Sequence, residues 1–291
     1  MACRPCGPDR RRSNPRTAAI PEFKKTEATQ VGITGSALTA GIGSATRKEI
    51  AIILAVAVLV IGGLEFVLWA YDVPQYILPR PSLIAAALVK EFPLLLPHLG
   101  YSMVSLLSGF TIGAVTGMVM AAIVTQYPLV EKVVTPYILV LVTTPMLALV
   151  PLLILRFGFG YTPRIIAVAL AVGPMVMINA ATGFRRTDSA KLALARSYGA
   201  STLQIFWKIR APMALPMILV GLMIGSIFGL LTTVGAEMVG GGFGLGNRLT
   251  TYSSMINMPE FFAVILLLSI IGILIYVIFF LIGKKWASWE T

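Results

Sequence analysis

Six long apolar segments, separated by shorter polar ones, make up most of this sequence. An α-helix needs about 20 mostly apolar residues to cross the hydrocarbon core of a membrane, and each segment is close to that length. The predicted spans are residues 50–71, 98–124, 133–155, 165–183, 216–239 and 261–282. The pattern therefore predicts an all-α, polytopic membrane protein with about six transmembrane helices.

Proline, glycine and one acidic residue add detail to these spans. Pro145 and Pro151 predict a kink in the third span, because proline removes a backbone hydrogen bond. Glu65 lies inside the first span, and the cost of placing an acid in lipid predicts that it faces protein or water. The second span carries small residues at four-residue spacing, which allow close helix approach and favour packing within the chain over a dimer face: Gly109, Gly113 and Gly117.

The segments between spans are predicted to be turns and loops with little helix. Residues 72–97 are expected on the outer side, with a short helix around 83–92. Residues 125–132 form an inner turn, and residues 156–164 and 240–259 are outer loops.

One polar, basic segment, residues 187–216, interrupts the apolar pattern and predicts a helical hairpin outside the membrane. Its helices are expected at residues 189–198 and 202–209. Asp188 is placed to cap the first helix, because its side chain can accept a hydrogen bond from a free amide at the helix start. Gly199 ends that helix, since the position after a helix commonly needs a positive φ.

The second helix of the hairpin begins with a capping box and carries an apolar surface. Ser201 and Gln204 have the spacing at which each side chain bonds the other residue's backbone amide. Leu203, Phe206 and Trp207 are expected to share one face. Such a tip suits a groove on another protein, and the alternative is that these side chains lie at the membrane interface.

Composition supports a membrane protein and defines its orientation. Of the 291 residues, 57% are hydrophobic and 12% are charged, about half the charge of a soluble domain. The net charge of +11 suggests nucleic acid, but eighteen basic residues fall on the hairpin side of the spans and five on the other. Cytoplasmic segments of membrane proteins are enriched in Lys and Arg. The hairpin and both termini are therefore predicted to be cytoplasmic, with no nucleic-acid partner.

The chain divides into a basic tail, residues 1–47, and a transmembrane domain, residues 48–291. The tail is expected to be disordered, because its composition lacks apolar residues to bury. Cys3 and Cys6 are the only cysteines and His98 is the only histidine, so one chain cannot complete a zinc site.

The sequence offers no set of residues for catalysis or for a cofactor. The glycines around Gly240 and Gly242 follow no strand, which makes a nucleotide fingerprint weak, and no Gly-Lys-Ser/Thr phosphate loop occurs. A membrane enzyme is the competing class, and a second histidine in a span would have favoured it. We expect no enzyme activity, no metal and no cofactor.

The hairpin resembles the EAA loop, the signature of ATP-binding-cassette (ABC) importer permeases. The sequence departs from that pattern at Ala193-Leu194-Ala195, where the family usually has Glu-Ala-Ala. The matching positions are Arg196-Ser197-Tyr198-Gly199-Ala200-Ser201, Pro212, Ala214, Leu215, Pro216 and Gly221.

Further segments resemble permeases of the nitrate, sulfonate and taurine type. They are residues 77–82, 152–160, 236–238 and 244–246. Relatives of this type also carry thiamine-precursor pyrimidines, riboflavin or aromatic acids, so these alternatives stay open.

The resemblance implies a type I, binding-protein-dependent importer in the inner membrane. Two permease copies, as a homodimer rather than a heterodimer, would form the path, a cytoplasmic ATPase would drive it, and an external binding protein would deliver solute. An ion-driven secondary carrier is the alternative. ATPase coupling would fall to Gly199, Ser201, Leu203, Phe206 and Trp207.

Two charged residues are candidates for the path of a small, anionic solute. Arg156 would favour anions at the outer mouth, or else snorkel at a span end. Glu237 would line the path or lock a helix.

Overall fold

The computed structural model describes residues 47–286, and every regular element within that range is a helix. The predicted basic tail, including Cys3 and Cys6, lies almost wholly outside the described residues. The helices are α2 (Arg47–Ala70), α3 (Pro81–Gln126), α4 (Pro128–Thr143), α5 (Met146–Phe157), α6 (Tyr161–Arg185), α7 (Ser189–Ser197), α8 (Thr202–Ile205), the π-helix η1 (Phe206–Arg210), α9 (Ala211–Gly240), α10 (Leu245–Ser254) and α11 (Met258–Trp286).

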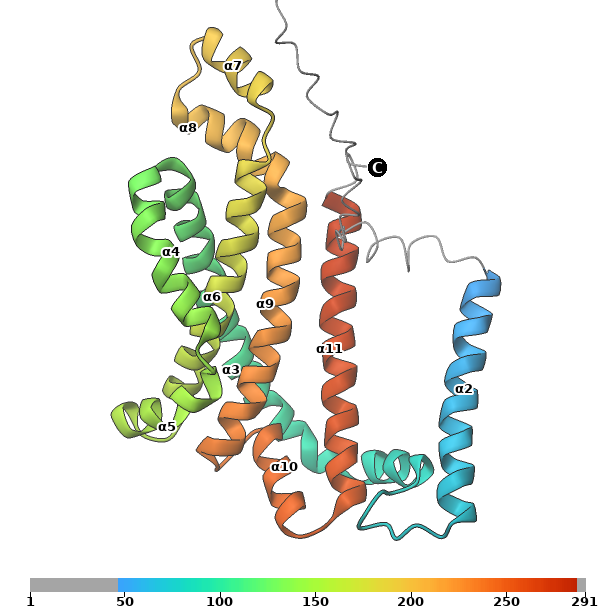
Figure 1. Cartoon of the computed structure of the whole chain (residues 1–291). Coiled ribbons are helices and arrows are strands. Elements are labelled where there is room, and N and C mark those ends of the chain that lie inside the picture. Colours follow the sequence, from blue (N-terminus) through green and yellow to red (C-terminus); the bar gives the residue numbers. More distant parts are fainter. Residues whose placement is uncertain (1–46, 287–291) are drawn as a thin grey trace, which may run out of the picture.

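The predicted all-α membrane fold is confirmed. Within the described range, five helical segments are long and apolar enough to cross a membrane, and the bent pair α4–α5 makes a sixth if it counts as one span. Figure 1 shows these helices side by side, with α7 and α8 beyond one end of the bundle and α10 at the other. We call these the hairpin end and the opposite end.

The third span differs from the predicted single kinked helix. The chain breaks at Thr144 and Pro145, and α4 and α5 meet at an angle of 95°. Thr144 is extended, which is the conformation that a following proline favours. The proline was correctly placed as the cause, but it ends one helix rather than bending it.

The second span also differs from its prediction. Residues 81–126 form one helix, so the predicted separate outer helix at 83–92 is wrong. Pro93 and Pro97 lie inside α3 without ending it. Figure 1 shows the first turns of α3 lying across the opposite end before the helix runs into the bundle.

Helices α3, α6 and α9 form the core of the bundle and approach closely at glycines. A side chain at Gly109 of α3 would stand 2.6 Å from Val168 Cβ of α6. A side chain at Gly183 of α6 would lie 2.8 Å from Met217 Cβ of α9. The small-residue stripe of the second span thus packs within the chain, as favoured above, because Gly109, Gly113 and Gly117 all face α6.

Helix α2 stands away from this core (Figure 1). It contacts the rest of the chain mainly near its C-terminus, at the opposite end. Glu65 accepts hydrogen bonds from the backbone amide of Ser82 at 3.0 Å and from its hydroxyl at 2.7 Å. Among the described side chains of α2, Leu68 is the buried one. Glu65 therefore faces protein, where it satisfies an amide at the start of α3 that has no partner within the helix.

Candidate functional site

The first helix of the hairpin begins and ends as its sequence predicts. The Asp188 side chain accepts a hydrogen bond from the amide of Ala190 at 2.9 Å, so it caps α7. Gly199 has a φ of +76° just after the helix. Nothing lies within 4 Å of where its Cβ would be, so it is the backbone conformation alone that favours glycine there.

The second helix of the hairpin has the predicted capping box. The amide of Ser201 donates to Gln204 Oε1 at 2.9 Å, and the amide of Gln204 donates to Ser201 Oγ at 3.3 Å. The helix does not end at Ile209 as predicted, because α8, η1 and α9 form one continuous run, Thr202–Gly240. The fifth span is therefore joined to the hairpin without a loop.

The predicted shared face of Leu203, Phe206 and Trp207 is wrong for Phe206. Leu203 is 68% exposed and Trp207 is 66% exposed, whereas Phe206 is 7% exposed. Successive residues of a helix point about 100° apart, and the boundary between bundle and surface falls between Phe206 and Trp207.

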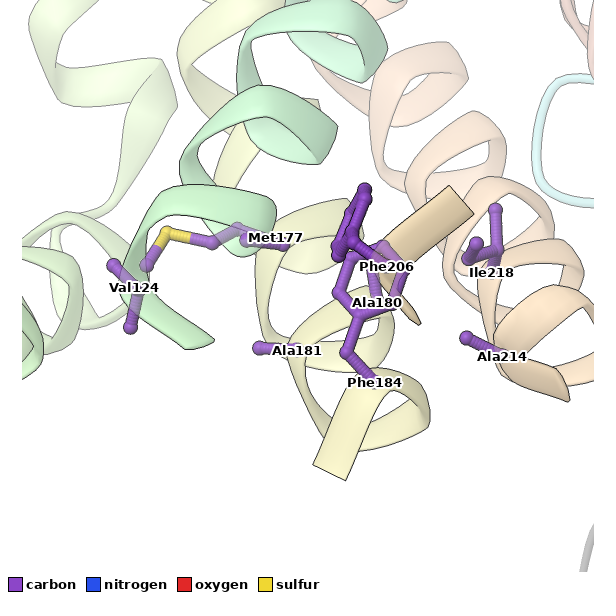
Figure 2. Packing of buried hydrophobic residues seen from close by; sticks show 9 residues of the cluster. Val124, Met177, Ala180, Ala181, Phe184, Phe206, Ala214 and Ile218 are labelled. Atoms are coloured by element: carbon purple, nitrogen blue, oxygen red, sulfur yellow. The ribbon is translucent and has the colours of Figure 1, made fainter. Parts of the chain in front are cut away.

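Phe206 belongs to the core of the bundle at the hairpin end. Its ring lies 5.0 Å from the ring of Phe184 on α6, and the same cluster includes Ala214 and Ile218 of α9. Figure 2 shows Phe206 directed toward Ala180 and Phe184, with Ala214 and Ile218 on the neighbouring helix. Phe206 therefore links the hairpin to α6 as well as to α9.

Four large side chains remain exposed on the hairpin, and we call them the hairpin patch: Leu194, Tyr198, Leu203 and Trp207. They are carried by α7, by the residue that follows it, by α8 and by η1, and no other described part of the chain covers them. Clusters of exposed apolar side chains mark contacts with another protein or with a membrane.

At the opposite end, Glu237 of α9 is fully buried, and it pairs with the start of α10. Its Oε2 accepts from the hydroxyl of Ser102 at 2.8 Å and from the amide of Gly246 at 2.9 Å. Ser102 in turn accepts from the amide of Leu245 at 2.9 Å. A carboxylate at a helix N-terminus satisfies free amides and complements the helix dipole. These bonds hold the start of α10, and a role of Glu237 in the path stays a prediction.

Arg164 of α6 is buried at the same end, with 2% of its surface exposed. Its guanidinium donates to the carbonyl of Phe243 at 3.0 Å and to that of Gly241, and it lies 4.0 Å from the centre of the Phe243 ring. His98 adds a further contact, since the amide of Gly244 donates to its Nδ1 at 3.2 Å.

The sequence interpretation missed Arg164, because residues 156–164 were taken for a loop. Only residues 158–160 are non-helical there, and Arg164 lies in the first turn of α6. The signal was available in an arginine followed directly by a long apolar segment. Arg156, which was singled out instead, is exposed at the end of α5, and its guanidinium lies 5.9 Å from the centre of the Phe157 ring.

The predicted outer loop at residues 240–259 is largely a helix, α10. The described residues contain no cluster of three or more His, Cys, Asp or Glu side chains that could hold a metal ion. The candidate functional residues thus lie in two places. The hairpin patch is at the hairpin end, and the buried charges Arg164 and Glu237 are beside α10 at the opposite end.

The structure is thus a bundle of apolar spans with a capped polar hairpin at one end. Residues 113–288 match the family described as "Binding-protein-dependent transport system inner membrane component", and the chain belongs to that family. It is therefore an ABC importer permease of type I, and the predicted resemblance is confirmed.

Two curated relatives extend the match over most of the chain. The taurine transport system permease protein TauC of Escherichia coli is 29% identical over 202 residues, which cover 69% of this chain and 74% of TauC. The riboflavin transport system permease protein RibX of Chloroflexus aurantiacus is 26% identical over 220 residues, which cover 75% of this chain and 82% of RibX.

A solved structure agrees with the fold. A chain of the MetNI methionine ABC transporter in an inward-facing conformation superposes with a TM-score of 0.62 at 19% identity. The match covers 67% of this chain and 97% of that one.

Proposed function

We propose that this permease is driven by a separate cytoplasmic ATPase that docks on the hairpin patch. The observation that carries the proposal is the exposure of Leu203 and Trp207 on a capped hairpin. Burial of exposed aromatic and aliphatic side chains is the main source of affinity in protein contacts.

The hairpin is built to pass a movement on to the spans. Residues Thr202–Gly240 form one helix, so a displacement of Leu203 or Trp207 displaces α9. Phe206 carries the same displacement to α6 through its contact with Phe184. Closure of the ATPases on ATP would thereby shift the permease between inward-facing and outward-facing states.

The hairpin end is the cytoplasmic end in this proposal, and both termini lie on the same side. The basic residues gathered near the hairpin support that orientation. The opposite end, with α10 and the buried charges, then faces outward and receives solute from an external binding protein.

A second copy of the chain and membrane lipid complete the path. Only 6% of the most apolar window of α2 is buried, and the same holds for α11, so most of their apolar surface needs a cover. Lipid and a homodimer partner are the covers that a bundle of this kind requires.

The proposed solute is a small anion of the sulfonate, taurine or nitrate type. The similarity to a taurine permease supports this choice. The similarity to a riboflavin permease keeps riboflavin as the alternative, together with thiamine-precursor pyrimidines and aromatic acids. An ion-driven secondary carrier would instead transport without any ATPase.

The proposal is tested by pull-down of the ATPase with purified permease. Loss of a central tryptophan contact costs about 2 kcal/mol, which corresponds to roughly 30-fold weaker binding. We expect that loss for Trp207→Ala and a smaller loss for Leu203→Ala. The matched control is Phe159→Ala, an exposed aromatic side chain outside the hairpin, which should bind the ATPase normally. Unchanged binding in both hairpin variants would reject the docking role.

A further inference from the structure

Two buried side chains of opposite charge hold one short backbone segment, residues 241–246. Arg164 binds two of its carbonyl groups, those of Gly241 and Phe243. Glu237 binds the amide of Gly246. Ser102 and His98 bind the amides of the two residues between. We call Arg164, Glu237, Ser102 and His98 the loop clamp, and its members come from α3, α6 and α9.

The clamp is more than a helix needs in order to end. A single glycine with positive φ after the last turn is sufficient to terminate a helix, and α9 already has Gly241 at +60°. Burial of Arg164 and Glu237 within the bundle is an added cost, since each charged group leaves water. Ionisable residues retained at such positions indicate function.

The contact with Glu237 is also incomplete. Its second carboxylate oxygen, Oε1, is buried and has no hydrogen-bond partner among the described residues. Buried polar atoms without a partner are uncommon and destabilise the arrangement that contains them.

The segment itself is suited to changing its backbone conformation. Gly241, Gly242 and Gly244 all have positive φ, from +60° to +102°. A Cβ at Gly244 would overlap the Glu237 carboxylate, so the backbone lies directly against that group. Glycine has access to several further conformations that other residues lack.

Phe243 is the large side chain of the segment, and it fills the space between two helices. Its ring lies 5.2 Å from that of Tyr101 on α3 and 5.0 Å from that of Tyr161 on α6. Arg164 contacts the same ring, so withdrawal of the segment would separate all these contacts together.

We propose that residues 241–246 form a gate at the external end, and that Arg164 and Glu237 are positioning residues that hold it closed between transport cycles. This inference rests on the proposed orientation of the permease. The gate opens when α9, moved from the hairpin, draws Glu237 and the segment that follows α9 away from Arg164.

The first half of the test uses one buried reporter residue and leaves the loop clamp unchanged. Ser105 is fully buried on α3, one turn from Ser102, and its hydroxyl bonds only the carbonyl of Tyr101 among the described residues. Ser105→Cys is introduced after Cys3→Ser and Cys6→Ser have removed the two native cysteines. Right-side-out vesicles carrying the complete importer are treated outside with a charged, membrane-impermeant methanethiosulfonate.

We expect slow modification of the reporter at rest and at least tenfold faster modification when ATP and vanadate are enclosed in the vesicles. Enclosed ADP should leave the rate at its resting value. Equal protection with ATP and vanadate would overturn the gate, because the segment then never opens.

The clamp variants give the second half of the test. Arg164→Gln and Glu237→Gln should each raise the resting rate toward the trapped rate, and Arg164→Lys should fall between. Lys90→Gln changes an exposed lysine to which no role is assigned and should leave the resting rate unchanged. Continued protection in both clamp variants would reject their positioning role. If the ATPase still binds the hairpin in that case, the gate fails and the proposed function stands.

Discussion

Gly199 is the residue on which the shape of the hairpin depends. Its φ of +76° costs another residue about 1–2 kcal/mol, and a β-branched residue more. Such an energy changes a conformational population by roughly 5–30-fold. We expect Gly199→Val to reduce transport by about that factor while ATP hydrolysis continues. Rates of uptake and hydrolysis are measured side by side in proteoliposomes.

Asparagine provides the matched control at this position. It adopts positive φ more readily than other non-glycine residues, and the space around Gly199 is open. Gly199→Asn should therefore transport nearly as well as the unchanged permease. Equal activity of the valine and asparagine variants would show that the hairpin does not need this backbone conformation.

Phe206 and Trp207 are neighbours with different expected roles. Phe206→Ala removes a core side chain, and such changes cost on the order of 3 kcal/mol. We expect a clearly lower unfolding temperature for Phe206→Ala and only a small change for Trp207→Ala. Thermal unfolding in detergent measures this difference, and the reverse order of the two variants would contradict the packing of Figure 2.

The sequence predicted the caps of the hairpin because a cap depends on residues within four positions of one another. Asp188, Gly199 and the pair Ser201–Gln204 all have the expected geometry. The burial of Phe206 depends on Phe184 of another helix, so local spacing could not reveal it.

At the scale of the element, α10 is stabilised by side chains from elsewhere in the chain. Its start is bonded to Glu237 and Ser102, and near its end the hydroxyl of Tyr252 donates to Glu91 Oε2 at 3.0 Å. The apolar repeat of α10 is short, because it is limited to Leu245, Leu249 and Tyr252 among ten residues that are otherwise polar or glycine. This explains why residues 240–259 were taken for a loop.

The contact of Tyr252 has a consequence at high pH. Burial, followed by the hydrogen bond to Glu91, raises the pKa of Tyr252 to about 12. An unfolded tyrosine has a pKa of about 10. Because the folded state favours the neutral phenol, this stabilisation is fully present below about pH 10 and is lost as the pH rises through about 12.

We expect Tyr252→Phe to remove one tyrosine that ionises only near pH 12. The difference in tyrosinate absorbance between the two permeases should rise near pH 12 rather than near pH 10. A difference near pH 10 for Tyr252→Phe would show that α10 is not held at Glu91.

The spans of the whole molecule were predictable because their length and apolarity are set by the membrane. The points at which these helices break were harder to predict. Pro145 ends a helix while Pro93 and Pro97 do not, since neighbouring groups decide whether a lost backbone bond is tolerated. The buried charges Arg164 and Glu237 contact the same segment only after α6 and α9 have packed.

Orientation is the property of the whole molecule on which both proposals depend. The two ends each offer an exposed aromatic residue for a single-cysteine test, Tyr198 on the hairpin at 84% exposure and Phe159 at 79%. In a permease without Cys3 and Cys6, an impermeant thiol reagent applied to right-side-out vesicles should label Phe159→Cys at once. It should label Tyr198→Cys only after the membrane is permeabilised, because the basic hairpin stays on the cytoplasmic side. Immediate labelling of Tyr198→Cys would place the hairpin outside, where no ATPase could reach it.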